Sequence, residues 1–192
     1  MKTLNCAILG YGNRGSVYAD LLYKTDGVKI SAVCDMSTEA VNRAKEKYNL
    51  ADEQCFTSEE EFFKSRRGEA CVIATMDKLH VRHAGRALTL GYDILLEKPI
   101  ATSYADCVEI ERIAEKHGNK ILVCHVLRYT AFFRKIKELL EKGEIGKITS
   151  VSESEDVDFV HYWLSFLHGN WHNEETSSPI ILQKCCHDFD II

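Results

Sequence analysis

No apolar stretch in these 192 residues approaches the roughly 20 residues that a membrane-spanning helix needs. The opening MKTLNCAILG leads directly into a strand-like run and shows neither the apolar core nor the cleavage site of a secretory leader. These absences argue against a membrane protein or a secreted one. We therefore expect a cytoplasmic protein.

The sequence also lacks an excess of basic side chains, since 24 Lys and Arg stand against 29 Asp and Glu, for a net charge of -5. No basic stripe interrupts this balance, so nothing electrostatic favours nucleic acid or an anionic membrane surface as a partner. The length is enough for one full core and part of a second. We expect the partner to be a small molecule.

No CxxC pair occurs among the eight cysteines. Four of them lie within strand-like apolar runs: Cys6, Cys34, Cys71 and Cys124. A buried cysteine behaves as a small hydrophobe, so we predict reduced, buried thiols rather than disulfides.

Short apolar runs alternate with amphipathic helical segments between residues 3 and 125. The runs are LNCAILG, VKISAVCD, ACVIAT, YDILLE and KILVCH. Apolar runs without alternation are typical of parallel strands that helices cover on both faces. The β-α-β-α order predicts an α/β fold with a doubly wound parallel Rossmann sheet over residues 1–124.

The pattern changes after residue 124, where a second, α+β domain is predicted to begin. A helix is expected around Phe132, Phe133, Ile136 and Leu140, then a strand over residues 147–153 and an aromatic, polar loop from residue 161. A lone strand and a helix start cannot bury both their faces. We therefore expect residues 125–192 to be an incomplete domain whose sheet is finished by further residues or a partner chain.

The segment GYGNRG, residues 10–15, follows the first predicted strand and precedes the helix-like SVYADLLYK. In this context Gly10 would make the tight turn, Gly12 would let a pyrophosphate approach the backbone, and Gly15 would allow close helix packing. The helix N-terminus offers unpaired amides to the phosphates. A plain turn is the alternative. We predict that the whole loop binds a dinucleotide: Gly10, Tyr11, Gly12, Asn13, Arg14 and Gly15.

Asp35 ends the second predicted strand, 20 residues beyond Gly15. Its carboxylate can accept hydrogen bonds from both ribose hydroxyls and would repel a 2′-phosphate. The residues that follow, Met36 to Thr38, bring no arginine to receive such a phosphate. The predicted cofactor is therefore NAD rather than NADP, although Asp35 could also simply begin the helix at Ser37.

LLEKPIA, residues 95–101, places Glu97 and Lys98 at the end of a predicted strand, the edge where open α/β sheets bind ligands. The two side chains could be an ordinary surface pair. At a cofactor crevice, Lys98 could instead donate to a substrate oxygen or act as a general acid or base.

Together with these motifs, VIATMDKLHVRHA, CHVLRY and the terminal HDFD make the chain resemble the Gfo/Idh/MocA oxidoreductases, which act mainly on sugars, inositols and related polyols with NAD(P). The resemblance covers essentially the whole chain. It implies that residues 1–124 bind NAD(P) and that residues 125–192 begin a domain for substrate binding and dimerisation. The full-length protein would then be a homo-oligomer.

The resemblance also implies roles for individual residues. Glu97 and Lys98 would contact the cofactor, with Lys98 bridging the nicotinamide ribose and the substrate. Thr75 and His80 would line the dinucleotide, although family members more often have proline near Met76.

His125 and Arg128, in CHVLRY, would lie close to the nicotinamide and to the substrate, respectively. Either could instead be a helix-boundary residue bonded to backbone. The chemistry of its side chain suggests that Trp171, in the aromatic loop, covers the apolar face of a sugar ring, and a flexible surface loop is the alternative.

In the family, the catalytic histidine follows an aspartate by four residues, and His187 in HDFD matches that histidine. Gln183 stands where the aspartate is expected, and an amide can bond a hydroxyl but cannot take its proton. Lys98 and His187 are therefore the candidate catalytic residues, with Gln183 binding substrate. A metal site at Cys185 and Cys186 is not expected, because adjacent cysteines on a helix point about 100° apart and the CxxC spacing is absent.

These observations favour an NAD-dependent oxidoreductase that transfers a hydride between the nicotinamide and a sugar, inositol or related polyol. Lys98 would orient and polarise the substrate, and His187 would move the proton. Two alternatives stay open: an NAD-dependent glycosidase of the same family, and a non-catalytic dinucleotide-binding protein.

Overall fold

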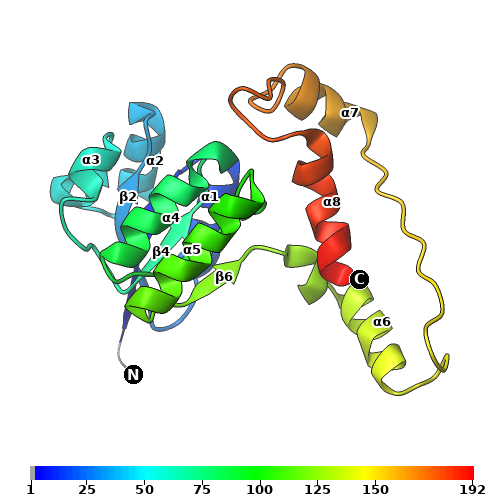
Figure 1. The fold of residues 1–192 in the computed structure, drawn as a ribbon. Helices are drawn as coiled ribbons and strands as arrows, with labels where there is room; N and C mark the ends of the chain where they lie inside the picture. Colours follow the sequence, from blue (N-terminus) through cyan, green and yellow to red (C-terminus); the bar gives the residue numbers. More distant parts are fainter. Residues whose placement is uncertain (1–2) are drawn as a thin grey trace. The chain divides into compact units, whose positions relative to one another are not determined.

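A computed structural model describes residues 3–192 (Figure 1). The chain divides into two compact units, with the boundary in the sequence between Val123 and Cys124. This boundary lies one residue before the one expected from the sequence.

The first unit is a six-stranded parallel sheet in the order β3-β2-β1-β4-β5-β6. Its strands are β1 (Leu4–Leu9), β2 (Val28–Cys34), β3 (Cys55–Phe56), β4 (Ala70–Ile73), β5 (Asp93–Leu96) and β6 (Ile121–Val123). The doubly wound Rossmann fold is thereby confirmed. Five strands match the predicted apolar runs, whereas β3 is too short to show a pattern.

Helices cover both faces of this sheet, as Figure 1 shows for the blue to green part of the chain. They are α1 (Asn13–Tyr23), α2 (Thr38–Tyr48), α3 (Glu59–Phe62), α4 (His80–Thr89) and α5 (Tyr104–His117), with short 3-10 turns η1 (Asp52–Gln54) and η2 (Asp77–Leu79). Alternate residues of β1 enter two different cores. Ala7 and Leu9 pack with the core that includes α4 and α5, while Cys6 and Ile8 pack with that of α1 and α2.

The four cysteines that the sequence places in apolar runs are buried and free, as predicted: Cys6, Cys34, Cys71 and Cys124. Burial raises the pKa of Cys6 to about 11, so this thiol stays protonated at neutral pH and behaves as an apolar side chain.

The regular elements of the second unit are all helical over the described residues, and long irregular segments join them. Its elements are η3 (Val126–Tyr129), α6 (Ala131–Glu141), α7 (Phe159–Tyr162), the π-helical turn η4 (Trp163–Leu167) and α8 (Ile180–Ile191). The helix predicted around Phe132 is confirmed as α6. It begins at Thr130, whose hydroxyl accepts a hydrogen bond from the amide of Phe133.

Two expectations for this unit were wrong. Residues 147–153 form no strand in the described chain and are exposed, because a strand needs a neighbour for its backbone hydrogen bonds. The segment expected to be a loop from residue 161 contains part of α7 and all of η4. The Asp158 carboxylate accepts a hydrogen bond from the amide of His161 at 3.0 Å and so caps a helix that the aromatic composition did not reveal.

Across residues 3–192, no helix combines the length and apolar character needed to cross a bilayer.

Candidate functional site

The glycine loop lies at the point where the strand order of the sheet reverses. β1 pairs with both β2 and β4, so the loops after β1 and β4 leave the carboxyl edge side by side. In open α/β sheets this edge is where ligands bind, because the loops diverge there and leave a crevice.

Gly10 and Gly15 are required by the backbone of this loop. Gly10 has φ +87°, and a Cβ there would lie 2.7 Å from the carbonyl oxygen of Ala74 and 2.9 Å from the amide nitrogen of Thr75. A Cβ on Gly15 would lie 1.8 Å from the carbonyl oxygen of Gly10. The turn and the close helix packing predicted for these glycines are both present.

Gly12 differs, since a Cβ there would meet nothing within 4 Å. It caps α1, and the first bond of the helix runs from the amide of Ser16 to the carbonyl of Gly12 at 3.0 Å. The amides of residues 13–15 come before this first helical donor, so they have no carbonyl partner within the helix. They carry the partial positive charge of the helix N-terminus. Open space beside these amides fits a diphosphate.

Asp35 is tied to the same loop. Its Oδ2 accepts a hydrogen bond from the amide of Tyr11 at 2.7 Å, and its Oδ1 accepts one from the amide of Ser37 at 2.8 Å. Each oxygen keeps further lone-pair capacity, so the carboxylate can still accept from ribose hydroxyls. The helix-entry role and the cofactor role are therefore compatible.

The side chain of Tyr11 is buried, at 3% exposure, and anchors the glycine loop from the inside. Its hydroxyl donates to that of Tyr48 at 2.9 Å, and Tyr48 donates to the Asp20 carboxylate at 2.7 Å. Tyr11 can therefore serve a cofactor only through its backbone. Asn13 and Arg14 occupy the exposed first turn of α1.

Two histidines of α4 hold Thr75, which lies two residues beyond the end of β4. The Nε2 atom of His80 lies 3.1 Å from the Thr75 carbonyl oxygen, and its Nδ1 lies 2.8 Å from the carbonyl of Pro99. His80 is only 1% exposed, so its place is between these two loops. The Nδ1 atom of His83 lies 2.9 Å from the Thr75 hydroxyl.

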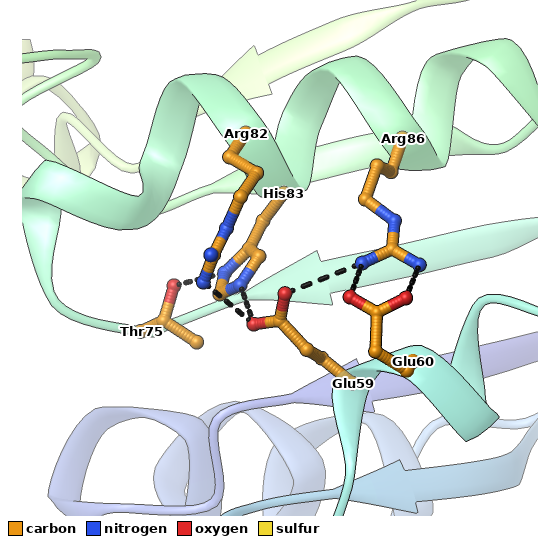
Figure 2. A network of polar contacts seen from close by, with 6 residues as sticks. All are labelled: Glu59, Glu60, Thr75, Arg82, His83 and Arg86. Atoms are coloured by element: carbon orange, nitrogen blue, oxygen red, sulfur yellow. Dashed lines mark hydrogen bonds and ion pairs between the residues drawn. The ribbon is translucent and has the colours of Figure 1, made fainter.

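Figure 2 shows what lies behind His83, which the sequence analysis did not single out. Its Nε2 is 2.7 Å from Oε2 of Glu59, and that carboxylate also accepts from Arg82 and Arg86. Burial lowers the pKa of His83, and the nearby carboxylate of Glu59 does not offset it. The imidazole is therefore neutral at neutral pH. The sequence does show two histidines three residues apart on one predicted helix, which indicates that both face the same way. Nothing in the sequence indicates that Glu59 contacts His83.

Glu97 and Lys98 follow β5 at the same carboxyl edge. Glu97 is 7% exposed, and its carboxylate accepts from the Tyr18 hydroxyl and, at 2.9 Å, from the amide of Lys98. The amide of Glu97 donates to the carbonyl of Ile73 at 2.9 Å, which fixes this turn to β4. Glu97 thus stabilises the turn after β5. The next residue in this turn is Lys98, which is half-buried.

In the second unit, η3 and α8 bring His125, Arg128 and His187 together. The rings of His125 and His187 meet edge to face with centroids 5.8 Å apart. Between these residues lies a carboxylate that the sequence analysis did not name, Asp190. Arg128 donates to it through Nε at 2.8 Å and through Nη2, and the Nδ1 atom of His125 lies 3.9 Å away.

Burial alone would raise the pKa of Asp190, but the Arg128 guanidinium and the two imidazoles outweigh it and hold the pKa below its usual range. Asp190 is therefore an anion at neutral pH. The signal for it was available in HDFD, where residue 190 falls one helical turn after His187.

The remaining predicted substrate residues lie in the same unit. Gln183 is 3% exposed and its amide donates to the Ser178 hydroxyl at 2.9 Å, at the start of α8. Trp171 is 37% exposed. Within residues 3–192, no group of three or more His, Cys, Asp or Glu side chains is arranged to hold a metal ion.

The chain matches a family model described as an oxidoreductase family with an NAD-binding Rossmann fold, over residues 4–125. It is 32% identical over 148 residues to 2,7-anhydro-N-acetylneuraminate hydratase of Mediterraneibacter gnavus, which covers 77% of this chain and 38% of that protein. It is 28% identical over 155 residues to scyllo-inositol 2-dehydrogenase (NADP(+)) of Bacillus subtilis, covering 80% of this chain and 42% of the relative.

Among solved structures, the fold resembles scyllo-inositol dehydrogenase of Lactobacillus casei with bound NAD(H) and scyllo-inositol. The TM-score is 0.83 at 22% identity, over 99% of this chain and 55% of that one. The chain thus spans only about two fifths to a little over half of these proteins. The family match covers the unit that carries the glycine loop, Asp35 and the turn at Lys98, and the chain belongs to the Gfo/Idh/MocA family of oxidoreductases.

Proposed function

We propose that the full-length protein is an NAD-dependent oxidoreductase that transfers a hydride between the nicotinamide and a CH–OH group of a sugar, inositol or related polyol. The observation that carries this proposal is the glycine loop at the switch point of the sheet, with Asp35 bonded to its backbone and Lys98 at the same edge. The names of the relatives, which include inositol dehydrogenases, support the substrate class.

In this proposal, the amides at the start of α1 and the loop around Gly12 hold the diphosphate, and Asp35 accepts from a ribose hydroxyl. When bound, NAD supplies the hydride acceptor. Lys98 donates to the substrate oxygen and orients it. His187 takes or returns the hydroxyl proton, and Asp190 stabilises its protonated form.

NAD is proposed over NADP because the Asp35 carboxylate would repel a 2′-phosphate. The relative from Bacillus subtilis is named for NADP(+), so family membership alone does not decide this choice.

The test uses the full-length protein with NAD and a panel of sugars and inositols, followed by absorbance of the reduced nicotinamide. A substrate-dependent signal that falls at least about a hundredfold in Lys98→Ala supports the proposal. Lys29→Ala, which removes an exposed lysine of β2, is the matched control and keeps its activity. Absence of NAD binding by the wild-type protein overturns the proposal.

A second candidate is a reaction without net oxidation, in which transient oxidation of the substrate promotes elimination, as in an NAD-dependent glycosidase. Two observations favour keeping it: Gln183 cannot act as a base, and the relative that is 32% identical is named a hydratase. Release of a leaving group from aryl glycosides, with no accumulation of NADH, would distinguish this reaction from the first. Binding of NAD without turnover of either substrate class would instead indicate a non-catalytic dinucleotide-binding protein.

A further inference from the structure

Thr75 lies at the switch point of the sheet, in the loop after β4, which neighbours the glycine loop after β1. It follows β4, and its amide nitrogen packs so close to Gly10 that a Cβ there would approach it to 2.9 Å. Because ligands of open α/β sheets bind between these two loops, the loop that carries Thr75 borders the proposed dinucleotide crevice.

The hydroxyl of Thr75 is the first member of a chain of hydrogen bonds that continues through His83 to Glu59 (Figure 2). Oγ1 lies 2.9 Å from Nδ1 of His83, and Nε2 of His83 lies 2.7 Å from the carboxylate of Glu59. His83 is 2% exposed, so water cannot replace either partner.

The direction of these bonds follows from the chemistry of Glu59. Its carboxylate accepts from Arg82 at 2.8 Å and from Arg86 at 3.2 Å, and an ionised carboxylate can only accept. His83 must therefore carry its hydrogen on Nε2 and donate to Glu59. A neutral imidazole then has only a lone pair on Nδ1, so the Thr75 hydroxyl donates to His83.

We infer that Glu59 and His83 are positioning residues that fix the hydrogen of the Thr75 hydroxyl toward the protein, so that Thr75 presents only oxygen lone pairs to the bound dinucleotide. Thr75 would accordingly accept from an N–H or O–H group, such as a ribose hydroxyl or the nicotinamide carboxamide. This inference rests on the proposed function for the identity of the ligand. The hydrogen-bond direction itself belongs to the chain alone.

The first test reads the tautomer of His83 in the cofactor-free full-length protein by ¹⁵N NMR of its ring. We expect a protonated Nε2 and an unprotonated Nδ1 near neutral pH. A protonated Nδ1 overturns the inference, whatever the protein binds.

The second test measures NAD affinity in matched variants by titration of the same protein. Thr75→Val keeps the shape but removes the acceptor, and we expect about three- to tenfold weaker binding. Thr75→Ser restores the hydroxyl and should stay within about twofold of wild type. Thr89→Val is the control, because Thr89 lies on α4 and bonds only its own helix, at the carbonyl of Gly85.

His83→Phe should weaken NAD binding to a similar extent, and adding it to Thr75→Val should cost little more, because both changes break the same chain. If His83→Phe fails to fold, the Thr75 pair and the NMR result decide. If wild-type protein binds NAD and Thr75→Val binds it equally well, the inference fails while the proposed function stands. If wild-type protein does not bind NAD, the proposed function fails, and the direction of the hydrogen bonds is decided by NMR alone.

Discussion

The carboxylate of Asp35 accepts a hydrogen bond from the amide of Tyr11 at 2.7 Å, although the two residues lie 24 positions apart. The acid at the end of β2 and the glycine loop after β1 are thus one structural unit. A change at Asp35 alters both the shape of the loop and the charge at the crevice.

We therefore predict that Asp35→Asn reduces the preference for NAD over NADP. Removing the negative charge removes repulsion of a 2′-phosphate. The dissociation constant for NADP divided by that for NAD should therefore fall by about tenfold or more. Both affinities are measured by titration of the full-length protein. Asp26→Asn, in the exposed turn before β2, is the control, and an unchanged ratio in Asp35→Asn would contradict the assigned role.

The glycine loop allows a second prediction, in which two similar substitutions have different effects. Gly12→Ala places a methyl group in open space and should fold like wild type, but it should weaken NAD binding at least about tenfold by blocking the diphosphate. Gly15→Ala meets the carbonyl of Gly10 and should lower the free energy of unfolding by about 2 kcal/mol or more.

Urea unfolding and NAD titration of both variants give the comparison. Equal losses of stability in the two variants would contradict the open space beside Gly12, and unchanged NAD affinity in Gly12→Ala would contradict its place beside the diphosphate.

The Asp190 anion should control the pH dependence of turnover. It favours the protonated form of the nearby imidazoles, so Asp190→Asn makes proton loss easier. In the oxidation direction, where His187 must be neutral to accept a proton, we expect the acid limb of the pH profile of kcat/KM to move to lower pH.

Asp188→Asn, on the same helix, is the matched control and should leave the profile in place. An acid limb that stays unchanged in Asp190→Asn would remove either His187 or Asp190 from the proposed proton transfer.

Stability should also depend on pH through His83. The pKa of His83 is lower in the folded protein than in the unfolded chain, where it is about 6.5. As pH falls through that value the unfolded chain gains a proton that the folded protein does not, so the free energy of unfolding falls until the folded pKa is reached.

We therefore expect His83→Gln to be less stable than wild type near about pH 7.5 and the gap to narrow by about pH 5.5, as measured by urea unfolding. The difference between the two proteins isolates His83 from the charged groups around it, which are Glu59, Glu60, Arg82, Arg86 and His80. A constant gap would contradict the assigned direction of the shift.

Most of the first unit could be predicted from the sequence, because its strands are short apolar runs and its glycine loop has a fixed spacing. The strand β3 could not, since Cys55–Phe56 is too short for any periodicity. The contact between Glu59 and His83 could not either, because it depends on the packing of α3 beside α4 and leaves no local pattern.

The second unit was harder to predict because its expected strand has no described neighbour. The run from Lys147 has strand-like residues, but a strand also needs a second segment to share its backbone hydrogen bonds. The sequence of one segment does not show whether such a partner is present. Asp190, by contrast, could have been predicted, because on a helix a carboxylate three residues after His187 lies on the same face as the imidazole.

The division of the chain also determines what can be seen by spectroscopy. Both tryptophans, Trp163 and Trp171, belong to the second unit, whereas the first unit contains Tyr11 and Tyr48 joined by a hydrogen bond. Indole fluorescence therefore reports on one unit alone, and circular dichroism, which senses the helices of both, would reveal whether the two units unfold together or in separate steps.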